Sequence, residues 1–97
     1  MRTPEGIEKD DISKYLKDIG AFFFKPFMTG YGGAGVPDIV FCIGGRFGAV
    51  EVKREGKEPT PRQRLRIAEI QKAGGFAVWG TAAKVIPEIE TWLSRTG

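Results

Sequence analysis

Apolar positions along the chain recur at two different spacings, and the wider spacing marks helices. Over residues 4–19 apolar side chains return every three or four positions, which predicts a helix with Thr3 as its N-cap. Residues 61–73 repeat this pattern directly after Thr60, another typical capping residue, and therefore predict a second helix. A last short helix is expected to begin at Pro87, because proline suits the first helical position.

Short apolar runs between these helices predict strands. Gly44-Gly45 joins two of the runs with a tight turn, so those two strands should be antiparallel neighbours. The resulting order of elements is α-β-β-β-α-β-α, which predicts one α/β domain over 1–97 with a central mixed sheet flanked by helices. The expected strands cover residues 21–24, 38–43, 46–53 and 76–79.

The chain of 97 residues contains no histidine, and this absence excludes several classes of enzyme. Ser-His-Asp and Cys-His hydrolases, nucleases with a histidine base and zinc sites with histidine ligands are all ruled out. The single cysteine, Cys42, can form no internal disulfide, and we expect it in the core as a small apolar residue. Acid–base or metal chemistry must therefore come from carboxylates, lysine, tyrosine or water on a metal.

The net charge of +3 matters less than its distribution. Residues 53–66 carry six basic and two acidic side chains, a local surplus larger than that of the whole chain. Such a segment is typical of a surface that binds a polyanion, but it also fits a solvated helix face, and charge alone does not separate the two.

Nothing in the sequence indicates a membrane or a secretory route. No apolar run approaches the ~18 residues that a transmembrane helix needs. The first residues lack the apolar stretch of a signal peptide. We therefore expect a cytoplasmic protein, in the host cell if it is viral, with no membrane partner.

Three charged residues are expected to meet at one end of the predicted hairpin. Glu51 and Lys53 share one face of their strand because side chains alternate with period two. Asp38 begins the preceding antiparallel strand, which places it at the same end of the hairpin. Two carboxylates there would suit Mg²⁺ or Mn²⁺, and the lysine could bind a phosphate or orient a water. A surface pattern of cross-strand charges is the alternative, and the presence of Asp38 opposite favours the metal site.

Gln63 has two interpretations that the sequence leaves open. It fits a capping box with Thr60, and it also shares the inner face of the predicted helix with Ile67 and Ile70. In one interpretation Gln63 only caps the start of the helix. In the other it also points into the site.

The glycine-rich loop at 29–37 is not a nucleotide-binding loop. It lacks the Gly-Lys-Ser/Thr of a P-loop and no helix follows it, so no nucleotide cofactor is expected. Its glycines, among them Gly33 and Gly35, would instead permit close approach to a DNA backbone.

Taken in order, these motifs resemble the VRR-NUC domain, a branch of the PD-(D/E)XK nuclease superfamily. The resemblance covers about residues 5–79. It implies a Mg²⁺- or Mn²⁺-dependent DNA endonuclease, and the small stand-alone members are associated with homodimers that cut branched DNA such as Holliday junctions. The motifs that carry it are Gly35-Val36-Pro37-Asp38, Glu51-Val52-Lys53, Thr60-Pro61-Arg62-Gln63, and Gly74-Gly75 before a strand.

The resemblance also implies roles for single residues. Asp38 and Glu51 would bind the metal, helped by the backbone carbonyl of Val52. Lys53 would be the catalytic lysine, and Gln63 would support the site from the second helix.

The family also has a glutamate on its first helix. Glu5 matches it by its distance to Gly20, and we prefer it, but Glu8 lies on nearly the same helix face and periodicity does not separate the two.

The leading hypothesis is thus a structure-specific endonuclease acting as a homodimer on branched DNA. Two alternatives remain: a nuclease for flaps, single strands or ordinary duplex, and a basic DNA-binding module without catalysis. In each case the expected DNA contacts are Arg54, Lys57, Arg62, Arg64, Arg66, Gly33 and Gly35.

Overall fold

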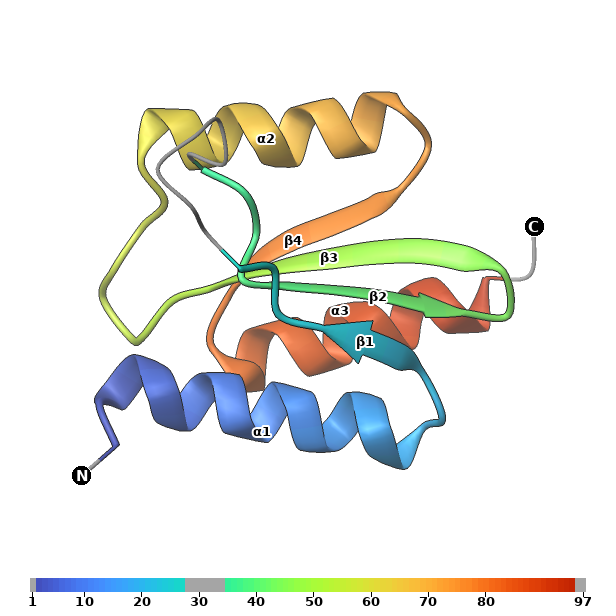
Figure 1. Ribbon diagram of the computed structural model, residues 1–97, viewed down its shortest axis with the longest axis horizontal. Coiled ribbons are helices and arrows are strands. Elements are labelled where there is room, and N and C mark those ends of the chain that lie inside the picture. The colour runs from blue at the N-terminus through green and yellow to red at the C-terminus, as the bar shows by residue number, and fades with distance from the viewer. Residues whose placement is uncertain (1, 28–34, 96–97) are drawn as a thin grey trace.

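A four-stranded sheet lies between three helices in the computed structural model, which describes residues 2–27 and 35–95. Helices α1 (Pro4–Asp18) and α3 (Ala82–Ser94) pack side by side on one face of the sheet (Figure 1). Helix α2 (Pro61–Lys72) lies on the other face, against the last two strands. This arrangement confirms the predicted α/β class and the order of elements.

The strands follow one another across the sheet in chain order. The first three are joined antiparallel, whereas the last runs parallel to its neighbour, which makes the sheet mixed as predicted. The strands are β1 (Phe22–Phe24), β2 (Ile39–Ile43), β3 (Arg46–Val52) and β4 (Phe76–Gly80).

The β2–β3 hairpin closes through the glycine pair that the sequence indicated. Gly44 and Gly45 both have positive φ, +57° and +78°, between the paired residues Ile43 and Arg46. Two residues with positive φ form a type I′ turn, whose twist matches that of the flanking strands. This turn fixes the register that brings the far ends of β2 and β3 together.

The main core fills the space between the sheet and the pair α1–α3. Inward-facing positions of the strands alternate with outward-facing ones, and the inward set meets the apolar stripes of both helices. Its fully buried large side chains are Ile12, Leu16, Ile39, Val50, Val52, Val85 and Ile89.

Helix α3 begins earlier than predicted. It starts at Ala82, with Thr81 as N-cap, so that Pro87 lies inside the helix and not at its first position. The prediction was wrong because it gave weight to the proline. Ala82, Val85 and Ile89 form a buried apolar stripe, and this packing outweighs the backbone hydrogen bond that Pro87 removes.

The expectation for Cys42 was also wrong. Its neighbours Phe41 and Ile43 face the core, so strand alternation turns the thiol to the opposite face, where it is exposed. Every other predicted helix or strand differs from the observed one by a single residue at one end. None of the helices within the described residues is long and apolar enough to cross a membrane.

Candidate active site

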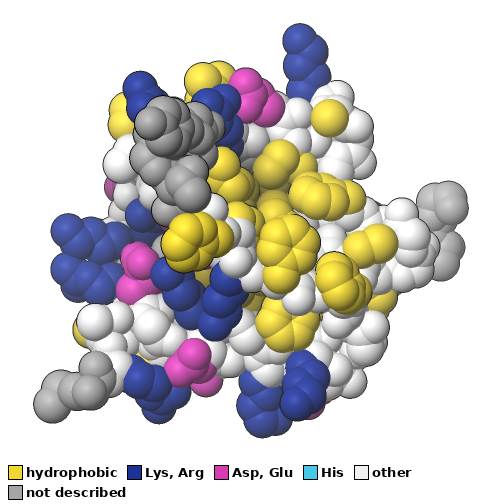
Figure 2. Space-filling model, in the orientation of Figure 1, with side chains coloured by type: hydrophobic (Ala, Val, Ile, Leu, Met, Phe, Trp, Pro, Cys, Tyr) yellow, Lys and Arg dark blue, Asp and Glu magenta, His cyan; other side chains and the backbone are white. Residues whose placement is uncertain are grey.

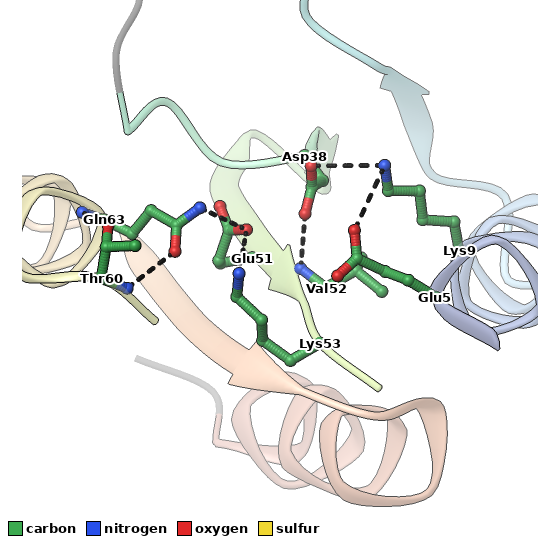
Figure 3. A network of polar contacts seen from close by, with 8 residues as sticks. All are labelled: Glu5, Lys9, Asp38, Glu51, Val52, Lys53, Thr60 and Gln63. Atoms are coloured by element: carbon green, nitrogen blue, oxygen red, sulfur yellow. Dashed lines mark hydrogen bonds and ion pairs between the residues drawn. The ribbon is translucent and has the colours of Figure 1, made fainter. Parts of the chain in front are cut away.

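The hairpin brings Asp38, Glu51 and Lys53 to one end of the sheet, as strand pairing predicted (Figure 3). Asp38 directly precedes β2, and its Oδ2 accepts a hydrogen bond of 2.9 Å from the backbone N–H of Val52. This bond ties the start of β2 to the end of β3. It therefore holds the Asp38 carboxylate beside Glu51.

Glu51 is buried, with 2% of its surface exposed, and no other charged residue in the described part of the chain is buried to this degree. Its Oε2 accepts a hydrogen bond of 3.2 Å from Gln63 Nε2 and lies 3.7 Å from Lys53 Nζ. Its Oε1 is buried without a hydrogen-bond partner. A buried carboxylate oxygen left unsatisfied is costly, so Oε1 requires either a proton or a bound cation.

Gln63 combines both roles that the sequence left open. Its side-chain Oε1 accepts a bond of 2.9 Å from the Thr60 N–H, while Thr60 Oγ1 accepts one of 3.2 Å from the Gln63 N–H. The capping box therefore directs the amide oxygen toward Thr60. The amide NH₂ group is then free to donate to Glu51, so the start of α2 also orients the buried carboxylate.

Burial raises the pKa of Glu51 to about 8. The neighbouring Asp38 contributes to this shift, both by accepting a hydrogen bond from the protonated carboxyl group and by its negative charge. Glu5 adds a smaller effect of the same sign, and the Lys53 ammonium partly offsets these effects. The raised pKa is thus caused mainly by burial, and the neighbouring carboxylates add to it.

The first helix adds Glu5 and Lys9 to the site, as Figure 3 shows. Lys9 Nζ lies 3.5 Å from Asp38 Oδ1 and 3.9 Å from Glu5 Oε2. Glu8, the alternative that periodicity could not exclude, is engaged elsewhere: its Oε1 accepts a bond of 2.8 Å from the Ala82 N–H at the start of α3. Of the two glutamates, Glu5 is therefore the one that faces the site.

The carboxylates fit a divalent cation. Mg²⁺ typically binds through one or two carboxylates and keeps several waters. Asp38 and Glu51 supply such a pair, and the unpartnered Glu51 Oε1 is the kind of atom that a cation would satisfy. Within residues 2–27 and 35–95 no group of three Asp, Glu or Cys side chains forms a ready-made metal cluster. Further ligands would have to come from the Val52 carbonyl and from water.

The site opens into a hollow of about 440 Å³ between α1 and the loop after β3. Lys53 and Glu5 reach this hollow together with Arg54 and Lys57, both of which are exposed. The hollow thus presents three basic side chains and two acidic ones, Glu5 and Glu58, and Lys53 connects it to the buried Glu51 carboxylate. Such a surface attracts a phosphate backbone.

The three arginines on α2 have different surroundings. Arg64 forms an ion pair of 2.6 Å with Glu58, and Arg66 forms one of 2.8 Å with Glu69. Arg62 packs against Gly35, where the φ of +80° favours glycine and an added Cβ would lie 2.9 Å from the Arg62 carbonyl oxygen. Close packing on α2 is therefore a sufficient reason for glycine at 35. Gly33 lies outside the described residues.

Comparison with known proteins gives one informative match. The sequence matches no family model and no curated protein. A solved structure described as "VRR_NUC domain" superposes with a TM-score of 0.76 at 28% sequence identity. This chain has the fold of a VRR_NUC domain. The alignment covers 91% of this chain and 96% of the VRR_NUC chain, so it supports the resemblance that the ordered motifs predicted.

Sequence reasoning missed two residues near the site of this VRR_NUC-like fold. Lys9 lies one helical turn after Glu5, and that spacing was the available signal. Trp79 pairs with Glu51 across the parallel strands β3 and β4. No local pattern revealed it, because the pairing of β4 with β3 joins segments far apart in the chain.

Proposed function

We propose that this protein is a metal-dependent DNA endonuclease that hydrolyses phosphodiester bonds. The observation that carries the proposal is the buried Glu51 carboxylate, with one oxygen unpartnered, beside Asp38 and Lys53. The VRR_NUC fold supports the same conclusion, since the name denotes a nuclease domain of the PD-(D/E)XK type. The absence of histidine leaves carboxylates and lysine as the groups available for this chemistry.

Asp38, Glu51 and the Val52 carbonyl would hold Mg²⁺ or Mn²⁺. When bound, the ion supplies positive charge for the phosphoryl oxygens and lowers the pKa of a coordinated water. Glu5 would contribute from α1 through the hollow that it shares with Lys53.

The chain's own residues orient the reacting groups. Lys53, whose side chain is only 14% exposed, would stabilise the negative charge that develops on the phosphate and orient the attacking water. Gln63 fixes the Glu51 carboxylate through its hydrogen bond from the capped start of α2. Lys9 would position the Asp38 carboxylate through their ion pair.

We further propose that two copies act together on branched DNA such as a four-way junction. Helix α2 leaves the outer face of β1, β2 and the start of β3 open, and an aromatic surface lies there, made of Phe22, Phe24, Cys42 and Phe47 (Figure 2). Phe22 and Phe47 each pair with Cys42 in the sheet and are 71% and 46% exposed. A contiguous apolar surface of this kind marks an interface. A two-fold dimer would present two sites for paired incisions.

The second candidate substrates are flaps, single strands and ordinary duplex DNA. The basic hollow at Arg54 and Lys57 accepts any phosphate backbone and does not by itself select a four-way junction. A DNA-binding module without catalysis is the contrasting class. It would bind DNA in a salt-sensitive way and cleave none of these substrates.

One panel of labelled DNAs separates these functions. The purified protein would be incubated with a four-way junction, a flap, a single strand and a blunt duplex, each with Mg²⁺, with Mn²⁺ and with a chelator. We expect cleavage of the branched substrates with either metal and none with chelator. Binding of all four without cleavage in any condition would refute the nuclease. Measuring the protein's mass in solution alongside would test the dimer.

A further inference from the structure

Trp79 lies one strand away from Glu51, on the same face of the sheet. The two residues pair across the parallel strands β3 and β4, and residues paired in this way point to the same side. Trp79 packs with Ala49, Ile67 and Ala77 on the face that α2 covers, the face into which Glu51 also points. Its indole is therefore the aromatic group next to the proposed catalytic carboxylate.

The indole stands between two open hollows. One, of about 300 Å³, is lined by Arg64 and Gln71 from α2 and by Lys84 from α3. The other, of about 350 Å³, continues past Lys84 to Arg54 and Lys57, which also line the hollow of the proposed active site. Each volume lies at the small end of ligand sites, so it fits a single nucleoside and not a duplex.

Two cations lie over the Trp79 ring. Lys84 Nζ is 4.6 Å from the ring centroid and the Arg64 guanidinium carbon is 5.5 Å from it. Both side chains also pair with carboxylates, Lys84 with the buried Oε2 of Glu88 at 3.5 Å and Arg64 with the exposed Glu58 at 2.6 Å. The exposed Arg64–Glu58 pair contributes little stability, so a phosphate can replace that carboxylate.

The ring of Trp92, the second tryptophan, is covered by neighbouring side chains. It stacks on Phe76 with centroids 4.6 Å apart, and Arg46 lies 4.1 Å above its ring. Arg46 is also fixed there by a hydrogen bond of 3.1 Å to the Trp92 carbonyl. Among the described residues no aromatic ring stacks on Trp79. Lys84 likewise donates a hydrogen bond to the Trp79 carbonyl, so the two tryptophans differ in their ring contacts: Trp92 is covered by another aromatic ring, whereas Trp79 meets two cations and lines two hollows.

We propose that Trp79, Arg64 and Lys84 form a binding site for one unpaired nucleotide of the DNA substrate. The base stacks on the indole, and the two cations contact the adjacent phosphates, because an aromatic face beside a basic groove is the usual platform for single-stranded DNA. This inference rests on the proposed function and narrows its substrate class. The scissile bond would lie at a branch point where at least one nucleotide is unpaired, either in the free DNA or once the protein is bound.

The two tryptophans allow a direct test by fluorescence. In the Trp92→Phe variant, Trp79 is the reporter, and in Trp79→Phe the reporter is Trp92. Both would be titrated with a short oligothymidylate in the presence of chelator, so that no cleavage occurs. We expect a saturable loss of emission from Trp92→Phe and none from Trp79→Phe, with a blunt duplex giving a much smaller loss. Equal changes in both variants, or no change in Trp92→Phe, would overturn the site.

Affinity measurements give a second, independent test. Trp79→Ala should weaken oligothymidylate binding ~10-fold, which corresponds to about 1.4 kcal/mol. Lys84→Gln should weaken it by a smaller factor. Lys14→Gln is the matched control, since Lys14 likewise pairs with a carboxylate four residues on, Asp18, but lies on α1 away from the sheet edge. If Trp79→Ala does not fold, the comparison of Lys84→Gln with Lys14→Gln tests the site. Equal affinities of these two variants for oligothymidylate would refute it.

The outcome also distinguishes this site from the nuclease proposal. Quenching of Trp79 without any metal-dependent cleavage would leave the nucleotide site standing and refute the nuclease. Cleavage of branched DNA without quenching of Trp79 would support the nuclease and refute the nucleotide site.

Discussion

The two faces of the sheet are built in contrasting ways. The face under α1 and α3 is closed, and its central side chains, such as Leu16, Val50 and Ile89, are fully buried and entirely apolar. The face toward α2 is only partly covered. It contains the buried Glu51 and the half-buried Trp79, and it leaves the aromatic surface exposed.

This difference indicates that one face of the sheet stabilises the fold and the other carries the candidate active site. The closed face buries apolar area without any polar group to satisfy, so it contributes to the free energy of folding. The face toward α2 holds a carboxylate whose pKa is raised to about 8, so charging it works against the fold. Substitutions on the first face should therefore change stability, whereas substitutions on the second should change activity, assembly or the pH dependence of stability.

The largest expected effect is the loss of activity in Lys53→Met. Removing the ammonium next to Glu51 should lower the cleavage rate at least ~1000-fold, or about 4 kcal/mol in activation free energy, while DNA binding changes little. Lys57→Met is the control, because Lys57 lies in the same basic loop but is exposed. Rates measured under single-turnover conditions that are equal for the two variants would remove Lys53 from the mechanism.

The next largest effect is a loss of stability caused by a substitution on the closed face of the sheet. Leu16→Ala should lower the free energy of unfolding by roughly 2–5 kcal/mol, because it leaves a cavity in the main core. Leu65→Ala, at an exposed position of α2, should change it by less than ~0.5 kcal/mol. Urea unfolding would measure both, and similar losses for the two variants would contradict the contrast between a closed core and an open surface.

A smaller effect concerns pH and the face toward α2. The folded state keeps Glu51 protonated up to about pH 8, whereas the unfolded chain ionises it near 4.5. Unfolding therefore releases a proton between these values, and the metal-free protein should lose stability as pH rises from 4.5 to 8.

Glu51→Gln supplies the comparison for this pH dependence. The variant should lack this contribution, be the more stable protein at pH 8 without metal, and be inactive. Thermal unfolding across this pH range would measure the effect. A wild-type protein whose stability rises through the same window would show that Glu51 is not held protonated.

The smallest effect on the folded chain is expected at the aromatic surface. The double variant Phe22→Ser, Phe47→Ser should change the unfolding free energy of the monomer by less than ~1 kcal/mol, since both rings are already exposed. It should nevertheless halve the mass in solution, whereas Leu65→Ser should not. Light scattering would decide, and an unchanged mass would place the interface of any dimer elsewhere.

Much of the fold followed from local patterns. Strand alternation assigned Val50 and Glu51 to opposite faces, and Gly44-Gly45 fixed the hairpin that joins Asp38 to the end of β3. The start of α3 was missed because a local proline signal competed with a packing stripe that only the folded core explains.

The parts of the site that could not be predicted are those that depend on distant contacts. Glu5 and Glu8 have the same periodicity, and they are distinguished only because the start of α3 engages Glu8. Lys9 was signalled locally only by its spacing from Glu5, and Trp79 reaches the site through a pairing of β4 with β3 that no window of sequence contains.

The most direct test of the central claim is the initial rate of cleavage of a labelled branched DNA as a function of Mg²⁺ concentration, for the wild type and for Asp38→Asn. The asparagine keeps the size of the side chain but removes the charge that would bind the cation. We predict a wild-type rate that is zero in chelator and saturates with Mg²⁺, and no measurable rate for Asp38→Asn. Cleavage that persists in chelator, or an Asp38→Asn variant as active as the wild type, would contradict the account.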